Sequence, residues 1–331
     1  MKNMFNSKAE TLHKLKNILQ NAKIAPLIYF NIKQWKTEKK KWINNILELF
    51  GNVPLIVRSS CNLEDQKDSS NAGAFLSLLN VKSDKLSNAI ESVIDSYGKE
   101  NLQNKVLVQP MLENVIRSGV AFTHDPNTCS PYRLINWSYG KETNKVTEGS
   151  ESLMWQQAAE SPVEIPKIHI SILALLDELL TIFDQTPIDC EFAVTLENNK
   201  EVLWLLQARP LILSSQPETK KQQTARLKKI YDKVDRGMRP HPFLMGKKTV
   251  YGVMPDWNPA EIVGIRPKPL AYSLYRELVT DSIWAYQRHN YGYRNLRSFP
   301  LMPHFYGLPY VDVRLSFNSF IFPSSAAGIL K

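Results

Sequence analysis

Apolar side chains recur with two different periods along this chain, so both helices and strands are predicted. Residues 7–23 repeat apolar side chains at the spacing of an amphipathic helix. Ser7 stands where it can cap this helix, with Glu10 completing a capping box. Further helices are predicted to end at Gly51 and to begin near Ser83. Short apolar runs predict strands at 24–32, 53–57 and 75–81.

The later part of the chain continues the mixture. Apolar runs predict strands at 106–112, 118–124 and 132–138. Residues 168–183 are apolar nearly all round, which predicts a buried helix. Two apolar runs, 192–196 and 202–206, flank a polar turn at 197–200, the pattern of a two-stranded hairpin. Helices are also predicted around 225–234 and over 270–286, so the fold class is α+β.

The predicted hairpin places charged and amide side chains together. Asp189 and Glu191 are two residues apart, so in a strand they point to one side while Cys190 and Phe192 face the other. Gln207 and Arg209 repeat this spacing in the second strand, beside the carboxylates. Carboxylate and amide oxygens suit Mg²⁺, and an arginine fork suits phosphate oxygens. The same stretch is equally typical of a salt-bridged hairpin in an ordinary sheet.

A second stretch also has residues that suit a phosphate. The strand at 53–57 delivers Arg58, Ser59 and Ser60 at its end, where sheets commonly bind ligands. The polar loop that follows is rich in Ser, Asn and Gly, and Gly73 permits close approach of a phosphate to the backbone. Lys8 lies in the first turn of the first predicted helix, where a cation opposes the helix dipole and an anionic partner would explain it.

Composition and charge narrow the class of protein. With 331 residues, 43% of them hydrophobic, the chain has room for two or three domains. No apolar run approaches about 18 residues and the start is polar, so we expect no membrane span or signal peptide and a cytoplasmic location. Three scattered cysteines argue against a disulfide framework and a cysteine zinc site. The net charge of +9 lies largely in two basic runs without interleaved aromatic residues, so nucleic acid is not an expected partner.

Five motifs, read together, resemble the nucleotide-binding domain shared by phosphoenolpyruvate synthase, pyruvate phosphate dikinase and rifampin phosphotransferase. They are SKAETL at 7–12, VRSSCNLED at 57–65, DSSNAG at 68–73, VLVQPMLENVIRSGVAFTHDP at 106–126, and DCEF with LLQARP at 189–192 and 205–210. The resemblance covers roughly residues 1–213. It implies an ATP-grasp-like nucleotide-binding domain of two lobes that binds ATP and Mg²⁺.

The resemblance implies a role for individual residues. Arg58 and Arg209 would contact the phosphates and are the candidate catalytic residues, and Glu191 and Gln207 would serve Mg²⁺. The full set implied to bind the nucleotide is Lys8, Arg58, Ser70, Gly73, Asp189, Glu191, Gln207 and Arg209. One departure is that Asn6 and Ser7 stand where many relatives have glycine before the lysine.

A larger departure concerns the chemistry. The family passes phosphate from ATP to a histidine in a motif like GGxxSH, on a swivelling domain, and none of the six histidines here stands in such a motif. Residues 251–322 resemble a subgroup that includes bacterial L-glutamine kinase, whose members are much longer. We therefore expect a shortened phosphotransferase whose phosphohistidine domain is absent from this chain. Its acceptor would be a small molecule, with L-glutamine as the candidate, and AMP and phosphate would be released. The alternative is a non-catalytic ATP-binding or scaffold protein.

The expected organisation has four parts. Residues 1–105 and 106–213 would form the two lobes, 214–239 a basic linker and helix, and 240–331 the start of an aromatic-rich central domain.

Overall fold

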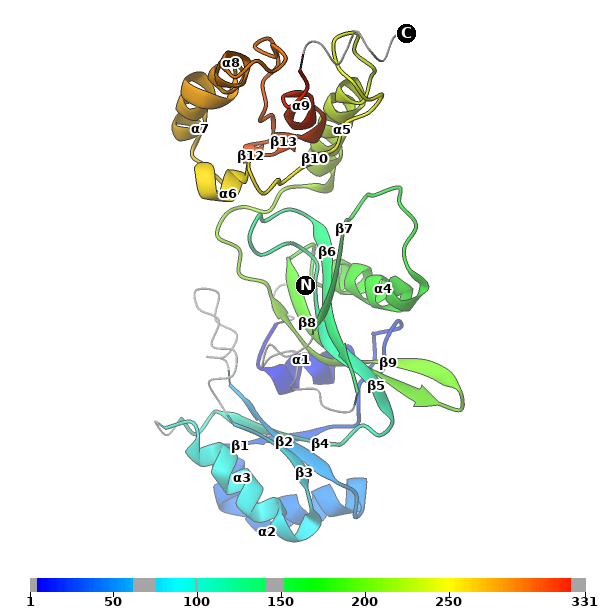
Figure 1. Ribbon diagram of the computed structural model, residues 1–331. Helices are drawn as coiled ribbons and strands as arrows, with labels where there is room; N and C mark the ends of the chain where they lie inside the picture. The colour runs from blue at the N-terminus through cyan, green and yellow to red at the C-terminus, as the bar shows by residue number, and fades with distance from the viewer. Residues whose placement is uncertain (1–4, 62–75, 99–100, 141–151, 323–331) are drawn as a thin grey trace. The chain divides into compact units, whose positions relative to one another are not determined.

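The computed structural model describes residues 5–61, 76–98, 101–140 and 152–322 (Figure 1). The chain forms two compact units, Met1–Gln223 and Thr224–Lys331. Within the described residues, no helix is both long and apolar enough to cross a membrane. The three cysteines are free and buried, as expected from their scattered positions.

The first lobe of the first unit is an antiparallel sheet with the strand order β1-β4-β2-β3. Its strands are β1 (Ile28–Asn31), β2 (Leu55–Ser60), β3 (Ser77–Val81) and β4 (Lys105–Pro110). Val57 and Val108 face a core shared with helices α2 (Ile32–Phe50) and α3 (Leu86–Asp95), which follows the short 3₁₀ turn η1 (Ser83–Lys85). Leu107, one position away in β4, faces the opposite way and joins the core of the second lobe. The expected lobe boundary between residues 105 and 106 thus falls inside β4, and the sheets divide after Pro110.

Helix α2 begins earlier than its apolar spacing alone indicates. The Asn31 side chain accepts from the Gln34 N–H at 2.8 Å, and the Gln34 side chain accepts from the Asn31 N–H at 2.8 Å, which is a capping box. The helix ends at Phe50, and Gly51 follows with φ +69°, a conformation that favours glycine. The predicted stop at Gly51 is confirmed.

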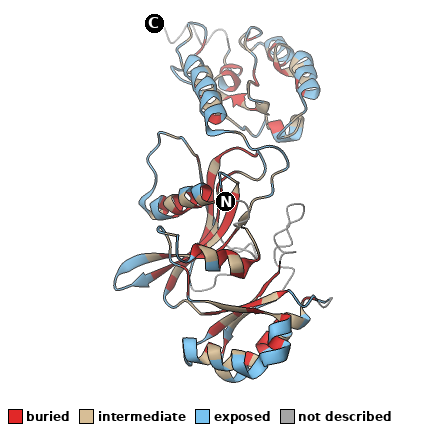
Figure 2. Ribbon diagram, turned by 180° about the vertical axis from the view of Figure 1, so that it is seen from behind, coloured by how far each residue is buried: buried red, intermediate tan, exposed pale blue. Residues whose placement is uncertain are grey.

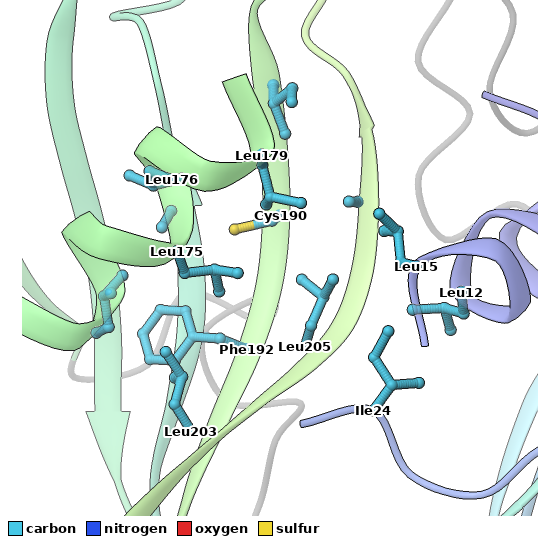
Figure 3. Packing of buried hydrophobic residues seen from close by; sticks show 14 of the residues in the cluster. Leu12, Leu15, Ile24, Leu175, Leu176, Leu179, Cys190, Phe192, Leu203 and Leu205 are labelled. Carbon is cyan, nitrogen blue, oxygen red and sulfur yellow. The ribbon is translucent and has the colours of Figure 1, made fainter. Parts of the chain in front are cut away.

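The second lobe is a five-stranded antiparallel sheet with the order β7-β6-β5-β8-β9. Its strands are β5 (Val115–Phe122), β6 (Tyr132–Tyr139), β7 (Leu153–Ala158), β8 (Ile188–Glu197) and β9 (Lys200–Pro210). Helix α4 (Lys167–Ile182) buries Leu175, Leu176 and Leu179 against Cys190 and Phe192 of β8 (Figure 3). β7 was not predicted from the sequence, because an edge strand with exposed Leu153 and Met154 has no continuous apolar run.

The predicted hairpin is confirmed as β8 and β9. Glu197 pairs with Lys200, and the two residues between them, Asn198 and Asn199, have φ of 48° and 60°. Two left-handed residues in succession are typical of a type I′ turn, in which asparagine is favoured.

Helix α1 (Lys8–Leu15) is shorter than the predicted 7–23. After Leu15 the chain turns, and the Glu178 carboxylate of α4 accepts from the N–H groups of Gln20 at 2.7 Å and Asn21 at 2.9 Å. Lys23 then bonds along β9, donating to the Leu203 carbonyl at 2.8 Å. These tertiary hydrogen bonds replace the helical ones, so the helix ends at Leu15. Leu19 and Ala22 still pack against the core, which is why the apolar pattern continues beyond the helix.

The expected side-chain cap of α1 is wrong. The Ser7 hydroxyl donates to the Glu10 carboxylate at 2.9 Å and makes no capping bond to the helix backbone. Glu10 also pairs with Lys105 of β4 at 3.0 Å. Burial raises the pKa of Glu10, but its bonds to Lys105 and Ser7 outweigh burial and lower it. The Ser7 hydroxyl is therefore used to stabilise a carboxylate rather than the helix end.

The second unit begins in helix α5 (Lys220–Gly237), which confirms the helix predicted around 225–234. Its other elements are the strands β10 (Tyr251–Gly252), β11 (His304–Phe305), β12 (Leu308–Pro309) and β13 (Val311–Asp312), and the helices α6 (Pro259–Ile262), α7 (Pro269–Tyr275), η2 (Arg276–Thr280), α8 (Ile283–Asn290) and α9 (Val313–Asn318). A core of apolar side chains includes Trp284, Leu301 and Val311. Figure 2 shows the outward side of α5 as exposed.

The single helix predicted over 270–286 is wrong. It is divided by the π-helical turn η2, in which the Asp281 N–H donates to the Arg276 carbonyl at 2.9 Å. The Arg276 guanidinium also binds the Asp281 carboxylate. A side-chain pair across five residues favours this wider turn, a local effect that the apolar period does not reveal.

Candidate functional site

The carboxylates Asp189 and Glu191 share one face of β8, as the sequence predicts. Cys190 and Phe192 are fully buried on the other face, against α4. The Glu191 side chain is 31% exposed and that of Asp189 is 11% exposed. The face that carries the carboxylates is therefore the one not covered by α4.

Amide and guanidinium groups lie opposite these carboxylates. Glu191 pairs with Gln207 in the register of β8 and β9, and Asp189 pairs with Arg209. The Arg209 Nε and one terminal nitrogen donate to the same Asp189 oxygen at 2.9 and 2.7 Å. Burial raises the pKa of Asp189, the Arg209 charge opposes that rise, and the neighbouring Glu191 adds to it.

A β-bulge in β9 makes this arrangement. From Glu197 to Phe192 the hairpin follows the register of its two-residue turn, but Phe192 pairs with Leu205 while Glu191 pairs with Gln207. Leu206 is the extra residue, and its carbonyl accepts from Arg58 at 3.3 Å. Without the bulge, Leu206 and Ala208 would lie opposite the carboxylates, and Gln207 and Arg209 would face α4.

Arg58 joins the two lobes. It comes from β2 of the first sheet, and one terminal nitrogen donates to Glu191 of the second sheet at 3.1 Å. Its side chain is 12% exposed, and its Nε is buried without a hydrogen-bond partner among the described residues. A buried guanidinium with one unused donor has capacity for a further oxygen ligand.

The start of α1 lies beside the same cluster. The Ala9 N–H donates to the Ser60 hydroxyl at the end of β2, at 2.9 Å, and the Lys8 side chain is buried. Burial raises the pKa of Glu191, but the positive charges of Arg58 and Lys8 outweigh burial and hold that pKa below its ordinary value. Glu191 is thus ionised at neutral pH.

The charges of this cluster favour an anionic ligand. Three cations, Lys8, Arg58 and Arg209, meet two carboxylates, so these five side chains carry a net positive charge. Within the described residues, no group of three or more His, Cys, Asp or Glu side chains is placed to hold a metal ion. Glu191 and Gln207 nevertheless supply two hard oxygen ligands side by side, and Mg²⁺ commonly takes only one or two protein ligands together with water and phosphates. The donor set therefore fits Mg²⁺ bound with a polyphosphate.

A family model matches the first part of the chain. Residues 3–152 match the pyruvate phosphate dikinase, AMP/ATP-binding domain. The match includes Lys8 and Arg58, and it ends before the β8–β9 hairpin. It supports ATP binding by this chain and its resemblance to the phosphoenolpyruvate synthase and pyruvate phosphate dikinase family. No curated protein matches the chain by sequence.

Solved structures with similar folds include D-alanine–D-alanine ligase from Helicobacter pylori, at 18% identity over 63% of this chain and 54% of that one, with a TM-score of 0.38. A protein of Pyrococcus horikoshii is 14% identical over 64% of this chain and 92% of that one, with a TM-score of 0.40. An acetyl-coenzyme A synthetase of Ca. Korarchaeum cryptofilum is 9% identical over 62% and 93%, with a TM-score of 0.39. The chain spans about half the length of the Helicobacter ligase.

Of the eight residues that the family resemblance implies bind the nucleotide, the structure brings together six: Lys8, Arg58, Asp189, Glu191, Gln207 and Arg209. Ser70 and Gly73 lie outside the described residues. Sequence reasoning did not identify the Leu206 carbonyl, because a backbone group leaves no mark in residue type. The signal in the sequence is a mismatch of one residue, because 192–197 separate Glu191 from the turn whereas the longer segment 200–206 separates Gln207 from it.

His124 lies two residues after the end of β5. It is buried, and its Nδ1 lies 3.0 Å from the Thr123 hydroxyl. Burial, with a contribution from the Arg133 charge, lowers its pKa to about 4, so the ring is neutral at physiological pH.

Proposed function

We propose that this protein binds Mg·ATP between the β2 end of the first sheet and the β8–β9 hairpin of the second. The observation that carries the proposal is Arg58, which crosses from one lobe to bond Glu191 and the Leu206 carbonyl of the other. A guanidinium held between two lobes, beside Lys8 and Arg209, is suited to a polyphosphate that also contacts both lobes. The match to the AMP/ATP-binding domain supports ATP as that ligand.

The residues of the cluster divide into two roles in this proposal. Glu191 and Gln207 would hold Mg²⁺, which neutralises charge on the phosphate oxygens. Arg58 and Arg209 would exchange their carboxylate partners for phosphate oxygens, and Lys8 would add a third positive charge. Binding would therefore rearrange ion pairs that already exist, so little reorganisation of the backbone is required.

We further propose that the bound phosphate is passed to a histidine on a separate domain and then to a small-molecule acceptor. Glutamine is the candidate acceptor, from the resemblance of residues 251–322 to the L-glutamine kinase subgroup, with AMP and phosphate as the other products. The sequence supports the need for another domain, since none of the six histidines stands in a motif like GGxxSH.

The absence of that motif also favours a second candidate, a non-catalytic ATP-binding or scaffold protein. Both candidates predict Mg²⁺-dependent ATP binding, so turnover separates them. Adding a separately expressed phosphohistidine domain would produce acceptor phosphorylation under the first candidate and none under the second.

Calorimetric titration of the chain with ATP, with and without Mg²⁺, tests the shared prediction. We expect saturable binding that Mg²⁺ strengthens, and the same affinity in the control variant Arg133→Ala, whose guanidinium pairs with Asp177 of α4 on the other face of the sheet. No binding at millimolar ATP would refute the proposal. In parallel, ³¹P NMR of the chain with glutamine, ATP and Mg²⁺ should show no P–N product. A P–N signal from the chain alone would refute the relay through a separate histidine.

A further inference from the structure

A group of cations lies in the second unit, far along the sequence from the residues discussed above. The Lys233 ammonium of α5 donates to the His304 carbonyl, and it lies 5.2 Å from the centre of the Phe305 ring. Lys233 is half-buried, and no carboxylate among the described residues pairs with it. An amine that is partly removed from water without a counter-ion is unfavourable, so a ligand that supplies one would stabilise it.

The carboxylates nearest to Lys233 on its own helix already have partners. Asp232 pairs with Lys228 at 3.4 Å, and Asp235 pairs with Arg239 at 3.1 Å. Arg236, one turn after Lys233, adds another positive charge. The helix therefore leaves Lys233 and Arg236 as an uncompensated pair of cations.

Arg276 brings a third cation from the π-helical turn η2. Its Nε and one terminal nitrogen bond to Asp281 at 3.1 and 3.0 Å, which leaves the other terminal nitrogen as a donor for a ligand. Burial, together with the charges of Arg276 and Arg236, lowers the pKa of Lys233. Arg276 lies one helical turn after Tyr272, whose ring packs against that of His304, so it belongs to the same region as Lys233 and His304.

His304 completes the group from the short hairpin of β11 and β12. Its Nδ1 accepts from the Gly307 N–H at 3.2 Å, so the neutral ring carries its proton on Nε2 and is a donor there. The ring packs edge-on against Tyr272, 5.2 Å away, whose hydroxyl is fixed on the Met302 carbonyl at 2.6 Å. Burial and the charges of Lys233 and Arg276 lower the pKa of His304. The imidazole is thus held in one orientation beside two cations.

We propose that Lys233, Arg276 and His304 form a second binding site for a small oxyanion, a phosphate or carboxylate group. Among the described residues, the only ion pair made by the three cations Lys233, Arg236 and Arg276 is that of Arg276 with Asp281. The donors of the site differ in geometry: an ammonium, part of a guanidinium fork and an imidazole N–H. Such a set matches an anion with several oxygens better than a single halide ion. The site is independent of the proposed ATP site, because it uses none of its residues.

NMR of the full chain tests this site. The imidazole Cε1–H signal of His304, assigned by its loss in His304→Gln, would be followed during titration with inorganic phosphate or with acetate, at an ionic strength held constant with chloride. We expect a saturable shift and a higher His304 pKa with one or both probes, because a bound anion offsets the nearby cations. Saturation by phosphate alone would identify phosphate groups as ligands, and saturation by acetate alone would identify carboxylates.

Matched lysine variants separate the site from overall charge. Lys233→Gln should weaken the apparent affinity by about tenfold or more, the loss of one charge-assisted hydrogen bond. Lys228→Gln, on the same helix and 75% exposed, removes the same charge and should leave the affinity unchanged. If Lys233→Gln does not fold, Arg236→Gln replaces it, with a several-fold loss expected. The proposal is overturned if the shift does not saturate. It is also overturned if the Lys228 and Lys233 variants bind the anion with equal affinity. If Lys233→Gln does not fold, the Arg236 variant takes its place in that comparison.

Discussion

Replacing Arg58 by alanine tests whether the contact between the lobes is also the ligand contact. In the wild-type protein the Arg58 guanidinium bonds to Glu191 at 3.1 Å and to the Leu206 carbonyl at 3.3 Å. Arg58→Ala removes both bonds and leaves the Glu191 carboxylate beside the phosphate site without its nearest counter-charge. Stability and ATP affinity should therefore both fall.

The two losses arise from different contacts. Because Glu191 is 31% exposed, water partly replaces the lost partner, and we expect a loss of about 2 kcal/mol in the free energy of unfolding, toward the lower end for bonds to charged groups. That loss corresponds to a fall of about 4–8 °C in melting temperature for a unit of this size. For ATP, loss of a charge-assisted contact worth about 1.5–3 kcal/mol weakens binding by about ten- to a hundredfold.

Urea unfolding and calorimetric ATP titration of four proteins measure these effects: wild type, Arg58→Ala, Glu191→Gln and the double variant. In the double variant no carboxylate is left unpaired, so its stability loss should be smaller than the sum of the single losses. Arg133→Ala is the control, because it breaks a comparable ion pair with Asp177 on the α4 face. If Arg58→Ala lowers stability as Arg133→Ala does but binds ATP with wild-type affinity, Arg58 is only a structural link and the proposed site is wrong.

Three further predictions follow from the described contacts. The pKa of His124 is lowered to about 4, so its neutral ring favours folding. This contribution of up to about 3 kcal/mol is fully present above pH 6.5 and is lost as pH falls toward 4. His124→Gln should flatten the pH dependence of the free energy of unfolding in urea over that interval, and an unchanged slope would contradict this. Glu178→Ala removes three hydrogen bonds from Gln20 and Asn21 and should lower the free energy of unfolding in urea by about 1–3 kcal/mol. Glu178→Gln should lose less, because its amide oxygen still accepts. Equal losses in the two variants would show that the carboxylate charge is needed. ATP should raise the melting temperature of the wild type, and chelation of Mg²⁺ with EDTA should abolish most of that rise. In Glu191→Gln the rise should already be small, so EDTA should change it little. If EDTA lowers the melting temperature of both proteins equally in the presence of ATP, Glu191 is excluded as a metal ligand.

Local patterns predicted most of the regular structure because local energies decide it. The helix stop at Gly51 and the turn at Asn198 and Asn199 depend on backbone conformations that few residues adopt, so residue type reveals them. Sequence patterns gave wrong predictions where groups distant in the sequence compete for the same backbone hydrogen bonds. The predicted 7–23 helix ends at Leu15 because Glu178 and β9, far away in the sequence, take over the hydrogen bonds of the next residues. The edge strand β7 was missed because half of it is exposed.

The candidate site shows the same division. The sequence by itself determined that Asp189 and Glu191 share a face opposite Cys190 and Phe192, since side chains alternate in any strand. The prediction that Gln207 and Arg209 lie beside these carboxylates is confirmed, but residue spacing alone did not determine it. The two-residue turn alone would pair Glu191 with Leu206, and only the bulge shifts the register by one residue and turns Gln207 and Arg209 to the carboxylate face. The bulge occurs where Arg58 from the other lobe bonds the carbonyl of the extra residue, a contact between residues 148 positions apart. Contacts across that separation depend on how the two sheets pack, which is decided only in the tertiary structure.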